Sequence, residues 1–296
     1  MGNPPMPVVT LIAAPTRRDL DPALVENLRN AWGGGDAFWL SPDEAARFEA
    51  PSVPENRWQV WQDCQALGVD LCVQADDRRR ALLLADMDST MTEQECIDEL
   101  AAEAGIGPRV AEITARAMNG ELNFEEALRE RVALLEGLDE GVIARVLSER
   151  ITLAPGGATL VATMRRDGGY AALVSGGFTQ FTGDVAARLG FDEHRANTLG
   201  IANGKLTGTV ADPILGRQAK VEAFQDLTAR LGLSPEDVMA VGDGANDLGM
   251  LEIAGAGVAL HAKPSVAAEC DLRINHGDLT ALLFLQGYRR DDFATV

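Results

Sequence analysis

The 296-residue sequence has few of the residues that build disulfide frameworks or soft-metal sites. It contains 4 cysteines and 3 histidines, and the cysteines are scattered, with no C-x-x-C pair. The spacings that are typical of zinc ligands and of small disulfide-rich proteins are therefore missing. Scattered cysteines of this kind are usually reduced thiols, which fit the cytosol. We expect a cytoplasmic protein.

Long hydrophobic runs and a surplus of basic residues are also missing. The longest apolar stretches, such as Ala81–Ala85, are far too short to cross a bilayer. The apolar run Val8–Ala14 has no basic stretch before it, so we expect no secretory signal. Only 26 basic residues stand against 45 acidic ones, a net charge of -19 that disfavours nucleic acid. We expect no nucleic-acid or membrane partner, and an anionic substrate would need a locally basic pocket.

The chain is longer than one typical domain, and its hydrophobic fraction of 46% is ordinary for a globular protein. Residues 1–77 show a strand pattern at Val8–Ala14 and a helix pattern at Asp21–Trp32. All four tryptophans lie in this segment. We therefore expect a small N-terminal α+β domain with a core of its own.

The pattern changes after this segment. Ala81–Ala85 is typical of a buried parallel strand, a helical block follows, and strand–helix alternation then runs through the rest of the chain. This alternation predicts an α/β fold with a doubly wound parallel sheet. The helical block predicts a cap, residues 92–152, inserted after the first strand of a core made of residues 78–91 and 153–296. Such a cap would cover the carboxyl edge of the sheet, where ligands bind.

Acids and small polar residues follow three of the expected strands. Asp86-Met87-Asp88-Ser89-Thr90 follows the first strand, Ser175-Gly176-Gly177 follows the second, and Gly242-Asp243-Gly244-Ala245-Asn246-Asp247 follows a third. Lys220 lies on a helix between the last two. Because the carboxyl ends of parallel strands meet at one edge, we expect these side chains to lie together.

Clustered aspartates repel one another unless a cation lies among them, and an all-oxygen site suits Mg²⁺. Lys220 and the metal could then neutralise a phosphate, and Ser175 with the N–H groups of the glycines, at an expected helix start, would form an anion cradle. An aspartate next to the metal can attack phosphorus as a nucleophile. A second carboxylate two residues later can act as general acid and base.

These four segments resemble the four motifs of the haloacid-dehalogenase superfamily of phosphohydrolases. The block from Glu121-Leu122-Asn123-Phe124 to Arg131, together with Glu95, is similar to the cap of the phosphoserine phosphatase family within it. The resemblance covers roughly residues 81–290 in order. It implies a Rossmann-like core with an inserted helical cap.

The resemblance implies a role for each acid at the strand ends. Asp86 would be the nucleophile and Asp88 the general acid/base. Mg²⁺ would be bound by Asp86, by the backbone carbonyl of Asp88 and by Asp243. Asn246 and Asp247 would support the metal and the phosphate.

The resemblance also implies how the substrate would be held. The phosphate would lie against Ser175, Gly176 and Lys220. The amino-acid part would lie under the cap, whose implied contacts are Glu95 for the ammonium, Arg131 for the carboxylate, and Met118 and Phe124 closing over the site.

The residues alone leave alternatives for several of these positions. Glu95 stands three residues after Thr92, so it could instead complete a capping box at a helix start. Arg131 interrupts an apolar helix face that includes Leu128; it could clamp a carboxylate or extend into solvent at the rim. Spacing does not separate Lys220 from an ordinary surface lysine. Arg217 receives no role.

We therefore expect a Mg²⁺-dependent phosphomonoesterase that hydrolyses O-phospho-L-serine to L-serine and phosphate, the last step of serine biosynthesis, through an aspartyl-phosphate. Its partner would be a small phosphorylated amino acid. One alternative is a phosphatase or phosphotransferase acting on another small phosphomonoester. Another is a non-enzymatic signalling module, because receiver domains also use clustered aspartates and Mg²⁺. A regulatory role for residues 1–77 and a homodimer stay open.

Overall fold

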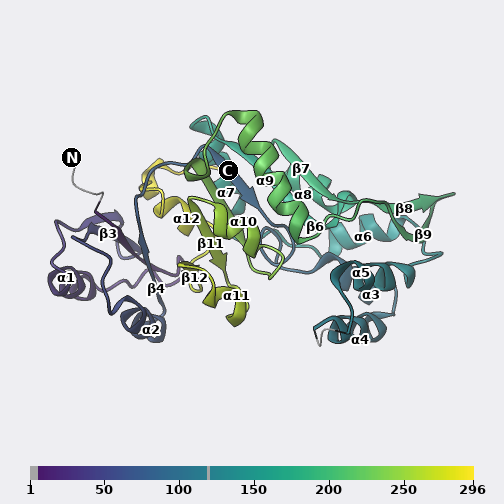
Figure 1. Cartoon of the computed structure of the whole chain (residues 1–296), viewed down its shortest axis with the longest axis horizontal. Coiled ribbons are helices and arrows are strands. Elements are labelled where there is room, and N and C mark those ends of the chain that lie inside the picture. Colours follow the sequence, from purple (N-terminus) through teal and green to yellow (C-terminus); the bar gives the residue numbers. More distant parts are fainter. Residues whose placement is uncertain (1–5, 119–120) are drawn as a thin grey trace.

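The computed structural model describes residues 6–118 and 121–296. A small antiparallel sheet with two helices lies at one end, a six-stranded parallel sheet with its helices lies in the middle, and a group of helices with a hairpin lies at the other end (Figure 1). The parallel sheet has the order β12-β11-β10-β5-β6-β7, and every neighbouring pair in it is parallel. The predicted α/β fold with a doubly wound parallel sheet is confirmed.

The N-terminal unit has the βαββαβ arrangement of ferredoxin-like folds. Its antiparallel sheet has the order β2-β3-β1-β4. Asp21 starts the first helix, because its side chain accepts a hydrogen bond from the N–H of Ala23 and Pro22 occupies the first helical position. The elements are β1 (Val8–Ala13), α1 (Pro22–Ala31), β2 (Phe38–Ser41), β3 (Ala45–Glu49), α2 (Arg57–Leu67) and β4 (Val69–Gln74).

The two faces of this small sheet pack into different cores. Val9 and Leu11 of β1 lie in a cluster that the N-terminal unit builds with its own helices. Ile12 of β1 and Cys72 of β4 lie on the other face, in the large cluster of the central sheet. The unit therefore has a core of its own, as expected, but also shares one with the rest of the chain.

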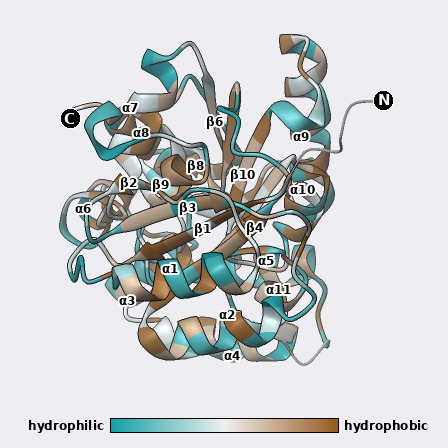
Figure 2. Ribbon diagram, turned by 90° about the vertical axis from the view of Figure 1, so that its left-hand side faces the viewer, coloured by the Kyte–Doolittle hydropathy of each residue, from teal (hydrophilic) through white to brown (hydrophobic). Residues whose placement is uncertain are grey.

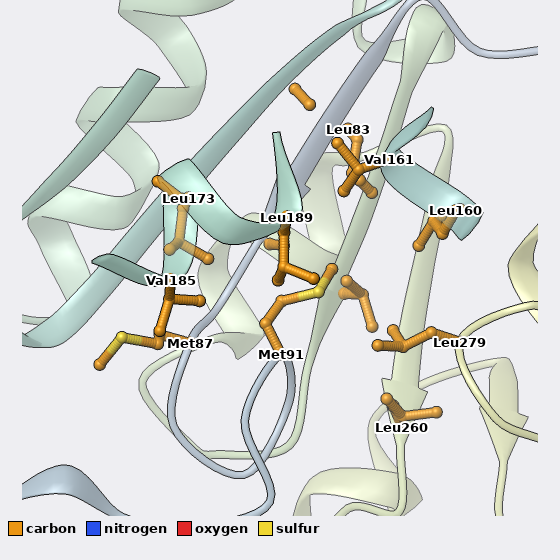
Figure 3. Packing of buried hydrophobic residues seen from close by; sticks show 14 of the residues in the cluster. Leu83, Met87, Met91, Leu160, Val161, Leu173, Val185, Leu189, Leu260 and Leu279 are labelled. Carbon is orange, nitrogen blue, oxygen red and sulfur yellow. The ribbon is translucent and has the colours of Figure 1, made fainter. Parts of the chain in front are cut away.

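The central sheet is covered on both faces because successive residues of a strand point to opposite sides. Leu83 of β5 packs with Leu160 of α7 and Val185 of α8 on one face (Figure 3). Leu82 and Leu84 pack with α9 and α10 on the other. Figure 2 shows the strands mainly in brown and α1 with teal turns on its outer side. The elements are β5 (Leu82–Ala85), α7 (Gly157–Arg166), β6 (Tyr170–Phe178), α8 (Thr179–Leu189), β7 (Glu193–Asn197), α9 (Arg217–Leu231), β10 (Val238–Gly242), α10 (Leu248–Ile253), β11 (Ala256–Leu260), α11 (Pro264–Ala268), β12 (Leu272–Ile274) and α12 (Ala281–Phe284).

The cap contains more than the helical insertion. A hairpin from the second half of the chain joins it, since backbone hydrogen bonds connect Leu206 with Gly137 and Leu138 in the segment between α5 and α6. The hairpin turns at Asn203-Gly204, where both residues have positive φ, as a two-residue hairpin turn requires. The elements are α3 (Cys96–Glu103), α4 (Gly107–Met118), α5 (Phe124–Ala133), α6 (Gly141–Glu149), β8 (Leu199–Ala202) and β9 (Lys205–Val210).

None of the helices in residues 6–118 and 121–296 has the length and hydropathy that a bilayer crossing needs.

Candidate active site

The ends of two neighbouring strands bring the aspartates together. β5 and β10 pair in parallel with Ala85 opposite Val241, and the N–H of Asp86 continues the ladder to the carbonyl of Val241 at 3.0 Å. One carboxylate oxygen each from Asp86, Asp243 and Asp247 therefore lies within 4.8 Å of the other two. All three residues are buried. The sequence-based expectation that these acids share one edge of the sheet agrees with this geometry.

Lys220 lies between two of these carboxylates. Its side chain is 0% exposed, and its Nζ is 2.6 Å from Asp86 Oδ1 and 2.6 Å from Asp247 Oδ1. Burial alone would lower the pKa of this lysine, but the two carboxylates outweigh burial and raise it. Lys220 is thus a fixed positive charge, and the alternative of a surface lysine is wrong.

Three carboxylates of the site have a raised pKa and are harder to ionise than free ones. Burial raises the pKa of Asp86, helped by the charge of Asp247 and opposed by Lys220. Burial and the nearby Glu95 raise the pKa of Asp88 to about 7. Burial and Asp247 raise the pKa of Asp243 to about 6. The protein alone leaves these charges incompletely compensated.

This donor set fits a hard divalent cation. The ligating atoms are carboxylate oxygens, which Mg²⁺ prefers. Asp86 Oδ1 is buried and, among the described residues, has no well-aligned hydrogen-bond donor, although Lys220 Nζ lies 2.6 Å away. A cation at this place would supply the missing compensation, so Asp86, Asp243 and Asp247 are suited to hold one.

Ser175, Gly176 and Gly177 face the aspartates from the end of β6. The strand continues through them to Phe178, with a shift in pairing register after Val174, and α8 begins only at Thr179. The expected helix start therefore lies directly after these residues, with Phe178 as its N-cap. The irregular strand end, a feature that commonly re-aims residues, turns them toward the site. The N–H of Gly177 donates to Ser175 Oγ at 2.9 Å.

The segment after Val174 passes close to Asp88 and is also held in place by hydrogen bonds to a neighbouring strand. A Cβ on Gly177 would lie 2.7 Å from Asp88 Oδ2, so any larger residue there would displace the Asp88 carboxylate. The carbonyl of Gly176 accepts a hydrogen bond of 2.8 Å from Asn197 Nδ2, and Asn197 Oδ1 accepts one from the N–H of Leu215. Asn197 was not predicted from the sequence; its one signal is a lone amide at the end of β7, just before β8.

Glu95 does not form a capping box. It precedes α3 in an extended conformation, with no side-chain hydrogen bond to the helix start, and Ser89 Oγ donates to its Oε1 at 3.0 Å. Thr92 Oγ1 instead donates to the carbonyls of Met87 and Gln94. The N–H of Cys96 at the start of α3 donates to Asp88 Oδ1 at 2.9 Å. Glu95 is free to face the cavity, and α3 orients Asp88.

The cap and the strand ends enclose a cavity of about 510 Å³. It is lined by Asp86, Asp88, Glu95, Ile97, Thr114, Ala117, Leu122, Phe124, Ala127, Leu128, Arg131, Ser175, Gly176, Gly177, Phe178, Arg217, Asp243, Gly244, Ala245, Asn246 and Lys263. Lys220 and Asp247 lie behind this lining. Met118 ends α4, and its side chain lies outside the described residues.

Arg131 and Phe124 reach the cavity from α5. Arg131 is half-buried, and burial lowers its pKa against the opposing charges of Asp98 and Glu95. It forms no ion pair with the described residues, so its guanidinium is available to a ligand. Phe124 lies over the phosphate-side glycines: a Cβ on Gly176 would be 3.2 Å from its ring.

The family model of the haloacid dehalogenase-like hydrolases matches residues 83–252, and the chain belongs to this family. Within it, the chain belongs with the phosphoserine phosphatases. The phosphoserine phosphatase of Streptomyces coelicolor is 39% identical over 96% of this chain and 71% of its own length. A HAD family hydrolase from Salmonella enterica serovar Typhi has a TM-score of 0.86 and 31% identity, covering 95% of this chain and 98% of its own. A phosphoserine phosphatase structure described as a phospho-aspartyl intermediate analogue has a TM-score of 0.65 and 39% identity, covering 70% of this chain and 99% of its own.

Proposed function

We propose that the protein hydrolyses O-phospho-L-serine to L-serine and phosphate through an aspartyl-phosphate on Asp86. The observation that carries this proposal is one cavity that joins two kinds of group. The aspartates and Ser175 suit a phosphate ester, while Arg131 and Glu95 in the same lining suit the carboxylate and ammonium of an amino acid. The product L-serine would place the enzyme at the last step of serine biosynthesis.

Asp86 would attack the phosphorus atom, and the bond from phosphorus to the serine oxygen would break. Lys220, 2.6 Å from Asp86, favours the ionised form that the nucleophile needs. Asp88 would give its proton to the leaving serine oxygen; a pKa of about 7 leaves a substantial protonated fraction near neutral pH. Asp88 would then take a proton from the water that attacks phosphorus, which releases phosphate and restores Asp86.

Mg²⁺ would be held by Asp86 and Asp243, with the backbone carbonyl of Asp88 and with Asp247 behind them. It would supply positive charge to the phosphate oxygens during both transfers. Ser175 and the N–H groups of Gly176 and Gly177 would bind the remaining oxygens, and Asn246 would support them.

The same residues decide between the alternatives. A receiver-type signalling module has no need of a proton donor beside its phospho-aspartate or of a cap with an arginine. Asp88 and Arg131 therefore favour turnover of an amino-acid ester over storage of a phosphoryl group.

The division into an N-terminal domain (1–77), a core (78–91 and 153–296) and a cap (92–152) is part of the proposal, as is a cytoplasmic location. All four cysteines are free and buried, which fits a reducing compartment. A homodimer stays a prediction for size-exclusion chromatography.

The test is phosphate release from L-phosphoserine, phosphoethanolamine and p-nitrophenyl phosphate, with Mg²⁺ and with EDTA. We expect metal-dependent release that is fastest from L-phosphoserine and absent in Asp86→Asn. Asp63→Asn, an exposed aspartate of α2, is the matched control and should keep full activity. Equal rates on all three esters would contradict the substrate, and steady turnover by Asp86→Asn would contradict the covalent step.

A further inference from the structure

Most cationic side chains of this acidic protein are paired with a carboxylate, as in Arg79–Asp167 and Arg195–Asp226. Three that line the catalytic cavity are exceptions: Arg131 under the cap, described above, and two others. Within the described part of the chain, Arg217 and Lys263 make no ion pair, although acids outnumber bases by 45 to 26. Both side chains are exposed. Cations left unpaired in such a chain are available to an anion from solution.

The two side chains reach the cavity from different elements. Arg217 is the first residue of α9, one turn before Lys220, and its Nε lies 3.8 Å from where a Cβ on Gly249 of α10 would be. Lys263 follows the carboxyl end of β11 and immediately precedes α11. Its charge acts on Asp243, whose carboxylate it helps to ionise. The two cations thus lie on the side of the cavity formed by the segment after β10.

Their position matters because of the charge of the whole protein. At -19 the chain repels the substrate, whose phosphate alone carries a charge of about -2 near neutral pH. At physiological salt this repulsion is screened over about 8 Å, so charges at the cavity itself decide whether an anion enters. Lys220 cannot act at a distance, because it is buried between Asp86 and Asp247.

We propose that Arg217 and Lys263 capture the phosphate dianion at the entrance and lead it to Ser175 and Lys220. This inference rests on the proposed function for the identity of the substrate. The two residues act on the encounter and on binding, and they take no part in the transfer at Asp86.

The experiment compares the double variant R217Q/K263Q with the control R109Q/K205Q. The control removes two exposed cations that also lack ion pairs among the described residues but lie outside the cavity lining. Both variants change the net charge by the same amount. The readout is kcat and kcat/KM for L-phosphoserine with Mg²⁺ at low salt and at about 0.15 M NaCl, where the Debye length is about 8 Å.

We expect R217Q/K263Q to lose about tenfold in kcat/KM at low salt, to depend less on salt than the wild type, and to keep its kcat. The control should retain the salt dependence of the wild type. A double variant whose kcat/KM and salt dependence match the control, or whose kcat falls with kcat/KM, overturns the proposal. If the wild type acts on p-nitrophenyl phosphate but not on L-phosphoserine, the proposed function fails, and the same comparison with p-nitrophenyl phosphate decides the role of the two cations.

Discussion

Replacing Lys220 with methionine tests the electrostatics of the site most directly. Methionine keeps much of the apolar stem and removes the charge that lies 2.6 Å from both Asp86 and Asp247. Each contact has a Coulomb energy of about 6 kcal/mol at an effective dielectric constant near 20, and the cost of burying the ions offsets much of it. Breaking a buried ion pair by removing one partner typically costs about 3–5 kcal/mol. We expect a loss of this size in the free energy of unfolding of the metal-free protein.

The loss should depend on pH with a definite sign. Without Lys220 the pKa of Asp86 in the folded state rises further above the unfolded value of about 3.9. Below that value both states are protonated and the penalty is absent; it grows as pH rises toward the folded-state pKa. Lys220→Met should therefore be weakened more at about pH 8 than at about pH 5.

Urea unfolding in EDTA at both pH values measures this effect. Lys263→Met is the matched control, because this lysine is exposed in the same cavity; its change should stay within about 0.5 kcal/mol. A loss below about 1 kcal/mol for Lys220→Met, or a larger loss at the lower pH, would refute the reasoning. Added Mg²⁺ should restore part of the stability, since it compensates the same carboxylates.

Three further changes have clear expectations. Gly177→Ala places a Cβ 2.7 Å from Asp88 Oδ2, a flexible end that can move, so kcat should fall about tenfold or more while stability drops by less than about 1 kcal/mol. Gly183→Ala in α8, whose Cβ would make only an ordinary contact with the His194 ring at 3.6 Å, should raise the melting temperature and keep kcat. Asp70→Ala should lower the free energy of unfolding in urea by about 3 kcal/mol. This buried carboxylate accepts hydrogen bonds from the N–H groups of residues 275–277, across the contact between the N-terminal unit and the core. A change under about 1 kcal/mol would contradict this expectation. Arg131→Ala should raise KM for L-phosphoserine but not for phosphoethanolamine, which lacks the carboxylate. Equal effects on both esters would contradict the proposed contact between Arg131 and the substrate carboxylate.

The part of the site that could be predicted from the sequence lies in short segments of the chain. The motifs at residues 86–90 and 242–247 follow buried strands, and parallel strands end at a common edge, so sequence order was enough to place these acids together. The helical block before residue 150 was also readable, because its apolar residues recur at helical spacing.

Residues whose role depends on distant partners could not be assigned in this way. Spacing along the helix does not separate Lys220 from a surface lysine, and only its contacts with Asp86 and Asp247 show that it is a buried charge. Glu95 matches a capping box in sequence, but Asp88 occupies the start of α3 instead. Asn197 has no motif at all.

The sequence by itself determined the fold class, the family and the acids of the catalytic edge, because these follow from local periodicity and from residues adjacent in the chain. The tertiary structure alone decided which charges are buried and which remain free. Lys220 is buried between two carboxylates. Arg217 and Lys263 line the cavity and form no ion pair with any residue that the structure describes. The physical reason is that the energy of a charge depends on its solvent exposure and on neighbours within a few ångströms, and neither is encoded by spacing along the chain.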